Sequence, residues 1–252
     1  MTPDAWAEAN QRHLVASLAR LRRALEAHAA GHPSSAPEGD EEPWTLPAPP
    51  ALSRLAEAFA LSPFERDVVL LAAGVEMDAA FAALCRDASG RAAPTFALAL
   101  AALAGAHWSA LAPGAPLRYW RLVEVGAGET LATAPVRIDE RVLHFLGGAG
   151  GLDERLHALA EPLDDDLPLP PSQRRAAARL AELWVRPAAV GPLPVLCGGP
   201  FAGTRAVAAA ASAGVGMRPH AVRAADLPAG ASEREQLARL WDREAVLGAA
   251  AL

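Results

Sequence analysis

The sequence predicts a mainly α-helical protein in which an α+β domain is followed by an incomplete α/β module with a parallel sheet. Between residues 51 and 160, three helical segments precede two extended segments and a further helix, which is the layout of a winged-helix domain. From residue 172 to residue 252, helical segments alternate with short apolar runs around a glycine-rich turn. That alternation predicts a parallel sheet covered by helices, of the kind that carries a phosphate-binding loop (P-loop).

Composition narrows the classes of function. The 252 residues are 52% hydrophobic, the net charge is −6, and the chain contains arginine but no lysine. This acidic balance argues against a broad nucleic-acid-binding face. The N-terminus has no signal-peptide pattern, and the longest uncharged stretch, residues 92–117, is interrupted by Pro and Gly. We therefore expect a cytoplasmic protein that does not enter a membrane.

Shifts in composition divide the chain into five segments. Leu14, Leu18, Leu21 and Leu25 form one stripe of the first helix, which we expect to pack on the neighbouring domain rather than to form a coiled coil. The segments are residues 1–29 (N-terminal helix), 30–50 (linker rich in Pro, Gly and acids), 51–160 (winged-helix-like domain), 161–171 (acidic, Pro-rich linker) and 172–252 (partial P-loop-like module).

Helix starts are marked by side chains that can accept a hydrogen bond from the first free backbone N–H groups. In the winged-helix-like domain these residues are Ser62, Asp78, Thr95 and Asp139, and Ser62 with Glu65 forms a capping box. In the last segment, Ser172 and the sequence Ser232–Glu235 predict two more starts. Extended segments are expected at residues 120–125, 131–139, 193–197 and 220–223.

The third helix of the winged-helix-like domain is where a DNA reader would carry its base contacts. Residues 92–117 contain no Arg, Lys, Asp or Glu, so this helix offers little for phosphates or base edges. We therefore favour protein packing over DNA binding. Trp108, Tyr119 and Trp120 are expected to pack in the core and against the wing rather than to stack on bases.

Residues 198–205, GGPFAGTR, follow the spacing of the P-loop pattern G-x-x-x-x-G-K-[ST]. Both outer glycines match, but Thr204 replaces the lysine that reaches the outer phosphates, and Arg205 replaces the hydroxyl that holds magnesium. The sequence therefore predicts a degenerate nucleotide-binding loop with no catalytic residue. The binding residues would be Gly198, Gly199, Gly203, Thr204 and Arg205. An ordinary strand-to-helix turn explains the same glycines equally well.

The remaining histidines, cysteines and acidic residues are not spaced to form a metal site, a disulfide or a catalytic site. The histidines at positions 107, 144, 157 and 220 are isolated, Cys85 and Cys197 are far apart, and three consecutive aspartates at 164–166 cannot face one point. We expect no metal site and no disulfide. Arg239 and Arg243 could act on a neighbouring subunit's phosphate, but pairing with Glu235 and Asp242 on the same helix is the favoured interpretation.

Residues 61–156, with LSPFERDVVLLAAGVEMDAAFAALC, PTFALALAAL, HWSALAPGAPLRYWRLVEVG and RIDERVLHFLGG, resemble the winged-helix region in front of certain bacterial AAA-family ATPases. The resemblance continues through PSQRRAAARLAELW and SEREQLARLWDREAVLGAAAL. It implies a cytoplasmic assembly ATPase of the kind associated with contractile, phage-tail-like injection systems, in which a degenerate ATPase module precedes an intact one. ATP and magnesium are implied for that parent protein, and Gly198 and Gly203 match its nucleotide-binding loop.

Three functions follow. The first is a partner-binding and oligomer-organising N-terminal region of such an ATPase, with a protein partner and a homo-oligomer. Because the chain stops inside the apolar run 246–252, before any magnesium-ordering carboxylate, we expect it to be the first part of a longer protein. The second is a freestanding winged-helix interaction module without nucleotide function. The third, a winged-helix DNA-binding regulator, is disfavoured by the acidic balance and the uncharged third helix.

Overall fold

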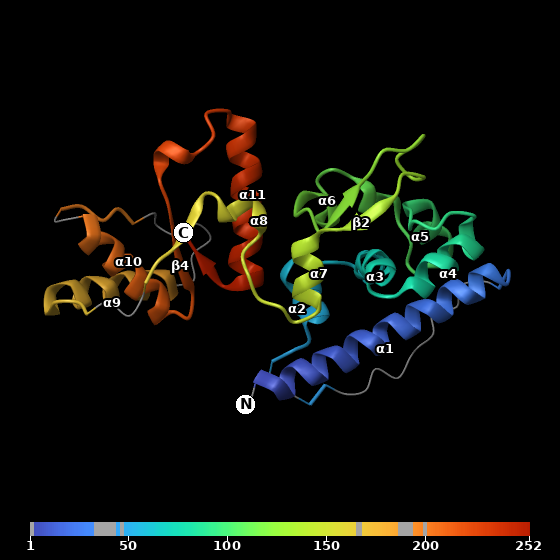
Figure 1. Ribbon diagram of the computed structural model, residues 1–252, viewed down its shortest axis with the longest axis horizontal. Coiled ribbons are helices and arrows are strands. Elements are labelled where there is room, and N and C mark those ends of the chain that lie inside the picture. The colour runs from blue at the N-terminus through green and yellow to red at the C-terminus, as the bar shows by residue number, and fades with distance from the viewer. Residues whose placement is uncertain (1–2, 33–43, 46–47, 165–167, 186–193, 199–200) are drawn as a thin grey trace. The chain divides into compact units, whose positions relative to one another are not determined.

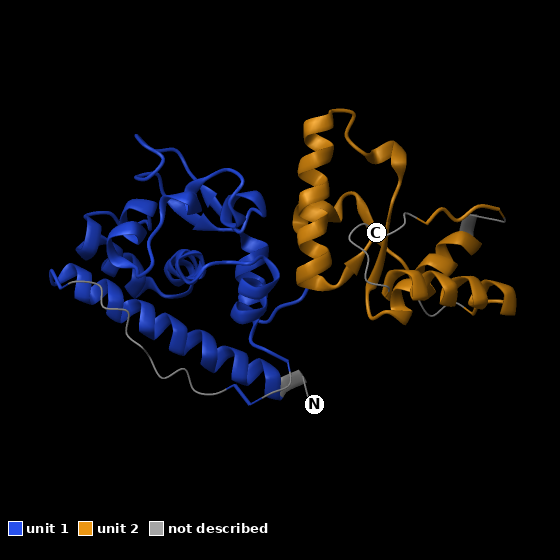
Figure 2. Ribbon diagram, turned by 180° about the vertical axis from the view of Figure 1, so that it is seen from behind, with its two compact units in different colours: residues 1–150 blue, residues 151–252 orange. Residues whose placement is uncertain are grey.

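The computed structural model describes residues 3–32, 44–45, 48–164, 168–185, 194–198 and 201–252. Contacts within the chain divide it into two compact units, unit 1 (Met1–Gly150) and unit 2 (Gly151–Leu252), shown in different colours in Figure 2. Most of the linker expected at residues 30–50, and Asp165 and Asp166 of the aspartate run, lie outside the described residues.

Unit 1 is a helical domain with one small hairpin (Figure 1). The hairpin is antiparallel, with Val123 opposite Ile138, and a bridge between Thr95 and Pro135 extends it beyond the second strand. The elements of unit 1 are α1 (Pro3–Ala29), α2 (Ala51–Ala58), α3 (Pro63–Met77), α4 (Ala79–Ser89), α5 (Phe96–Ala102), the 3-10 turn η1 (Trp108–Leu111), α6 (Pro116–Tyr119), β1 (Val123–Val125), β2 (Val136–Ile138) and α7 (Glu140–Leu146).

All four capping residues predicted in this unit are confirmed. The Ser62 hydroxyl accepts from the Glu65 N–H at 3.1 Å, and the Glu65 carboxylate accepts from the Ser62 N–H at 2.9 Å, which completes the capping box. Asp78, Thr95 and Asp139 accept in the same way at the starts of α4, α5 and α7. These starts are local, because each donor lies within three residues of its acceptor.

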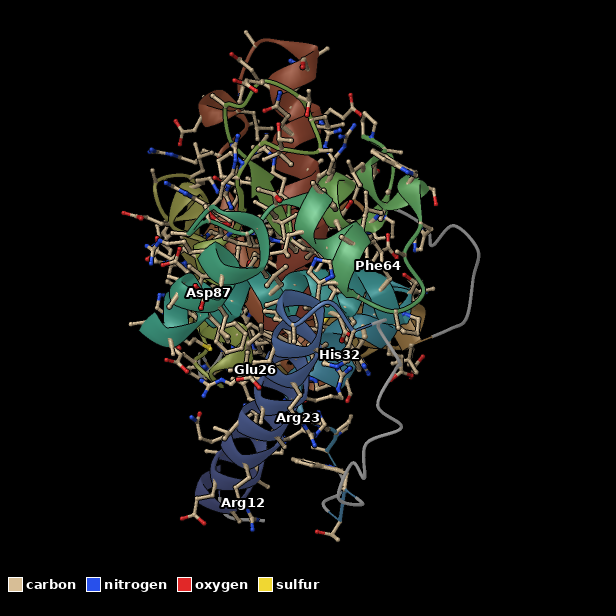
Figure 3. The ribbon with its side chains drawn as sticks, turned by 90° about the vertical axis from the view of Figure 1, so that its right-hand side faces the viewer. Arg12, Arg23, Glu26, His32, Phe64 and Asp87 are labelled. Atoms are coloured by element: carbon tan, nitrogen blue, oxygen red, sulfur yellow. The ribbon has the colours of Figure 1, made fainter. Side chains whose placement is uncertain are left out.

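The N-terminal helix α1 lies along α3 and α4 and forms one layer of unit 1 (Figure 1). Leu14, Leu21 and Leu25 of its predicted stripe are buried, and Arg20 donates to both carboxylate oxygens of Asp67 on α3, at 2.7 and 3.0 Å. The opposite face is solvated: the exposed side chains include Arg12, Arg23 and Glu26, which follow one another along the helix in Figure 3. The N-terminal helix thus packs on α3 and α4 of the winged-helix-like domain, as the leucine stripe predicts.

Asn10 connects three elements of unit 1. Its amide nitrogen donates to the carbonyl of Leu146 at the end of α7, at 2.9 Å, and its amide oxygen accepts from the N–H of Ala51 at the start of α2, at 2.8 Å. The side chain is 2% exposed, so both bonds are shielded from water. One side chain therefore holds the ends of α2 and α7 against α1.

Unit 2 contains a three-stranded sheet with the order β3-β4-β5. Strands β4 and β5 are parallel, as predicted for this segment, whereas β3 and β4 are antiparallel, with Glu161 opposite Ala221. The elements of unit 2 are α8 (Glu154–His157), β3 (Ala160–Pro162), α9 (Pro171–Val185), α10 (Phe201–Gly214), β4 (Arg218–Val222), the 3-10 turn η2 (Ala224–Asp226), α11 (Ala231–Gly248) and β5 (Ala250–Ala251).

Three local predictions for unit 2 are wrong. The strand expected at 193–197 is absent from the described residues 194–197, which lie outside the three-stranded sheet and leave Val195 76% exposed. The capping box at Ser232 does not form, because α11 starts two residues earlier, with Gly230 as its N-cap and the Gly230 carbonyl accepting from the Arg234 N–H. Likewise, Ser172 lies inside α9, which begins at Pro171.

The core of unit 2 has two parts. Between α9 and α10, Leu180 and Val207 pack with Ala177 and Ala211, and the small alanines let these helices approach closely. Beneath α11, the buried residues are Leu156, Ala160, Leu240, Leu247 and Ala250.

Candidate functional site

The glycine segment of unit 2 leads into the helix α10. Gly198 is exposed and has φ of +87°, a left-handed conformation that favours glycine, while Gly199 and Pro200 lie outside the described residues. Gly203, Thr204 and Arg205 all belong to the first turns of α10. The structure thus places these three predicted residues on one helix end, after a segment that is not a strand.

Gly203 has a packing role that the P-loop pattern does not require. A Cβ at this position would lie 3.1 Å from the side-chain nitrogen of Gln173 on α9, which is tighter than ordinary van der Waals contact. A side chain at this position would require the end of the Gln173 side chain to shift by a few tenths of an ångström. This supports the alternative interpretation of the glycine as part of a structural turn, without excluding contact with an anion.

A cavity of about 220 Å³ opens beside this turn. Its volume is below the roughly 300–1,000 Å³ of typical small-molecule sites. The residues around it combine two hydroxyls and one amide with apolar side chains, so it has few groups for phosphate charge. It is lined by Ser172, Gln173, Ala176, Leu196, Cys197, Gly198, Gly203, Thr204 and Val207.

Arg205, the residue in the magnesium-hydroxyl position, is engaged by a carboxylate. Its guanidinium lies 3.0 Å from the Glu161 carboxylate on β3, and its side chain is 26% exposed. A phosphate at this helix end would therefore compete with Glu161 for the guanidinium and would be repelled by the same carboxylate. The geometry makes Arg205 a weak replacement for a P-loop lysine.

A buried charge cluster lies elsewhere in unit 2. The carboxylate of Asp153 caps α8 by accepting from the Arg155 N–H at 2.8 Å, and it also accepts from the Arg155 Nε at 2.9 Å and from the Arg243 guanidinium. Burial acts to raise the pKa of Asp153, but its hydrogen bonds to Arg155 and the charges of Arg155 and Arg243 outweigh burial, so the pKa is lowered.

This cluster corrects one prediction and confirms another. Arg243 is fully buried and pairs with Asp153, not with Asp242, so it is not available to a neighbouring subunit's phosphate. Arg239 pairs with Glu235, as the helical spacing predicts. Asp153 was missed because it lies 90 residues away from Arg243 in the sequence. Its only local signal was the helix-capping position before Glu154.

In unit 1, the helix-turn-helix position before the hairpin is occupied by two short elements, η1 and α6, of four residues each. The Arg118 guanidinium donates to the carbonyl of Leu111 at 2.8 Å, within this turn. A recognition helix enters the major groove with several successive turns of side chains. One turn whose arginine is bound to its own backbone is a poor fit to that task.

Of the three aromatic residues expected to pack in this region, two do so and one is exposed. Trp120 packs on Phe59, with ring centroids 5.4 Å apart, and on Tyr119, so the prediction of packing is confirmed for Tyr119 and Trp120. The prediction is wrong for Trp108, which is 68% exposed. The buried positions of η1 are filled by Ala110 and Leu111, which leaves the indole to face outward.

The two cysteines differ in their surroundings, since Cys85 is buried and Cys197 is exposed. Cys85 and Cys197 are both free thiols, and burial raises the pKa of the Cys85 thiol to about 11. Within the described ranges, no cluster of His, Cys, Asp or Glu has the geometry to hold a metal ion. A search of those same residues finds no helix with the length and apolarity needed to cross a membrane.

Helices, a hairpin and a following helix place unit 1 in the winged-helix class of folds. Residues 3–160 match the family model described as winged helix domain, variant, and the chain belongs to this family. The matched range includes α1 in front and reaches α8 and the first residue of β3 behind. Comparisons with curated proteins and with solved structures gave no match.

Proposed function

We propose that this chain is the N-terminal, partner-binding and oligomer-organising region of an AAA-family ATPase, of the kind associated with contractile, phage-tail-like injection systems. Its degenerate P-loop would not hydrolyse ATP. The observation that carries this proposal is the pair Thr204–Arg205, which stands where a working loop has Lys and Ser or Thr. Without the lysine, the charge that develops on the outer phosphate has no cationic partner.

The order of elements in unit 2 supports the ATPase part of the proposal. A glycine segment enters α10, which leads through β4 and α11 to the parallel strand β5. Helices that connect parallel strands after a glycine-rich turn are typical of P-loop modules. The winged-helix domain supports the partner-binding part, since its helix-turn-helix region is short and its one charged residue, Arg118, donates to the Leu111 carbonyl, which suits a protein surface better than DNA.

A titration with a fluorescent ATP analogue, with and without magnesium, tests the proposal on the full chain. We expect no magnesium-dependent binding tighter than about 100 µM and no ATP turnover, because Arg205 is engaged by Glu161. Any residual anion binding should fall in the Arg205→Ala variant. It should be unchanged in Arg239→Ala, which removes the same charge from α11. Magnesium-dependent binding near 1 µM, or turnover abolished by Thr204→Ala, would contradict the proposal.

The second candidate is a freestanding interaction module whose glycine turn is only structural. The close approach of Gln173 to Gly203 favours it, because this contact with α9 gives the glycine a place in the packing that needs no nucleotide. The natural gene separates the two candidates. An intact G-x-x-x-x-G-K-[ST] in the same reading frame after residue 252 would support the ATPase, and a stop codon directly after residue 252 would support the freestanding module.

A further inference from the structure

A short glycine-rich segment, residues 147–151 with the sequence GGAGG, leads from unit 1 into unit 2. Its first three residues are tied to unit 1, because the N–H group of each donates to a carbonyl of α7. Gly148 also lies against α1, where an added Cβ would be 3.3 Å from the Trp6 ring. The chain is therefore fixed within unit 1 as far as residue 149.

The chain is fixed again at Asp153, within unit 2. The buried Asp153 carboxylate caps α8 and pairs with Arg155 and Arg243, and the buried Leu156 and the pairing of β3 with β4 hold the residues that follow. The family match extends to residue 160, so its last ten residues, 151–160, belong to unit 2. The structural boundary therefore falls inside the matched range, where the colour changes in Figure 2.

Gly150 and Gly151 lie between these two fixed points. Both are exposed, and neither forms a hydrogen bond with another residue in the described part of the chain. Gly151 has φ of +144°, which residues with a Cβ rarely adopt, and no atom beyond its chain neighbours lies within 4 Å of the place where a Cβ would be. Rotation about the backbone dihedrals of these two residues therefore breaks no hydrogen bond and disturbs no packed side chain.

The ending of α7 does not account for these two glycines. A helix commonly ends with one glycine in the left-handed region, and Gly148, with φ of +84°, occupies that position. The closing hydrogen bonds are complete at Ala149, whose N–H donates to the His144 carbonyl at 2.9 Å. Gly150 and Gly151 come after the last of these bonds, so they belong to the connection between the units and not to the helix cap.

We propose that Gly150 and Gly151 form a hinge about which unit 1 and unit 2 reorient as two rigid bodies. Hinges are a few loop residues that absorb changes in φ and ψ while the elements on either side stay intact. The flanks meet this requirement, because Asn10 holds the end of α7 within unit 1 and Asp153 holds the start of α8 within unit 2. The hinge lets the winged-helix domain engage a partner in more than one orientation relative to unit 2.

Nitrogen-15 relaxation of the backbone amides of the full 252-residue chain tests the hinge. The amides of the two units should give two rotational correlation times, the longer from unit 1 because it is the larger, and both shorter than a rigid body of 252 residues would give. The double variant Gly150→Pro with Gly151→Pro fixes φ at both residues and should bring the ratio of the two correlation times closer to one. The control Ala231→Pro places the same ring at the first residue of α11, where proline fits, and should leave the ratio unchanged. Amide chemical shifts away from the substituted residues should stay the same in every variant.

Two results would overturn the proposal. A single correlation time shared by both units of the wild-type chain would show that they move as one body. A ratio in the double proline variant equal to that of the wild type would show that any reorientation takes place at other residues. The hinge does not depend on the proposed ATPase role, which the nucleotide titration tests separately. Tight nucleotide binding by a chain with two correlation times would overturn the degenerate-loop proposal alone.

Discussion

The buried pair of Asp153 and Arg243 allows a quantitative prediction. The side chains of Asp153 and Arg243 are 3% and 0% exposed, so neither charge is solvated by water. Removing one partner of a buried pair typically costs about 3–5 kcal/mol, because the remaining charge is left in a low-dielectric environment. The substitution Asp153→Asn removes the charge and keeps a side chain that can still cap α8.

We expect Asp153→Asn to lower the free energy of unfolding of unit 2 by about 3 kcal/mol, toward the lower limit because the cap is retained. For a unit of this size, each kcal/mol lowers the melting temperature by about 4–8 °C, so the shift should be roughly 12–24 °C. The matched control is Asp226→Asn, which breaks a pair with the 79%-exposed Arg223 and should cost less than about 1 kcal/mol.

Urea unfolding followed by tryptophan fluorescence measures this free energy in a background in which the four tryptophans of unit 1 are replaced by phenylalanine, because the remaining two, Trp184 and Trp241, lie in unit 2. Circular dichroism of the same samples reports on both units. Equal midpoints for Asp153→Asn and Asp226→Asn would refute the reasoning, since it requires that burial separates the two pairs. A large loss confined to Asp153→Asn would support it.

The pairing of Asp153 with Arg243 also makes the stability of unit 2 depend on pH. The pKa of Asp153 is lower in the folded protein than the value of 3.8 for the free side chain. A depressed carboxyl pKa stabilises the folded state above the unfolded pKa, and this contribution is lost as the pH falls through the folded pKa. Unit 2 should therefore lose stability below about pH 4, and in Asp153→Asn that component should be missing from the acid-unfolding curve.

Two further predictions concern Asn10 of unit 1 and the two cysteines, one in each unit. Asn10→Ala leaves the Ala51 N–H and the Leu146 carbonyl buried without their partner, so it should cost about 2–4 kcal/mol in urea unfolding, whereas the exposed Gln11→Ala should change less than about 0.5 kcal/mol. A thiol reagent at pH 8 should modify Cys197 rapidly, but Cys85 only after unfolding, because Cys85 is fully buried and its pKa is about 11. Two modified thiols per native chain would contradict this.

Much of unit 1 could be predicted from sequence because its signals are local. Ser62, Asp78, Thr95 and Asp139 each bond to a backbone N–H within three residues, so sequence spacing contains the geometry. The leucine stripe of α1 likewise follows from helical periodicity. The fold class and the order of its elements therefore followed from residue types and their spacing alone.

The candidate sites depended on contacts between distant residues. Residues 161 and 162, expected in a linker, form part of β3 because β4 supplies partners about 60 residues later. Arg205 is engaged by Glu161 across 44 residues of sequence, and Arg243 by Asp153 across 90. No short motif encodes which carboxylate a given arginine will meet.

The sequence by itself determined where α3, α4, α5 and α7 begin, which face of α1 is apolar and which residues the glycine segment lacks for nucleotide chemistry. Only the tertiary structure decided that Trp108 faces outward, that residues 194–197 do not form a strand and that Arg243 is buried against Asp153. The physical reason is the sequence separation over which each interaction acts. Capping and periodicity act within one or two turns of chain, whereas burial and charge pairing depend on segments that meet only in the folded protein.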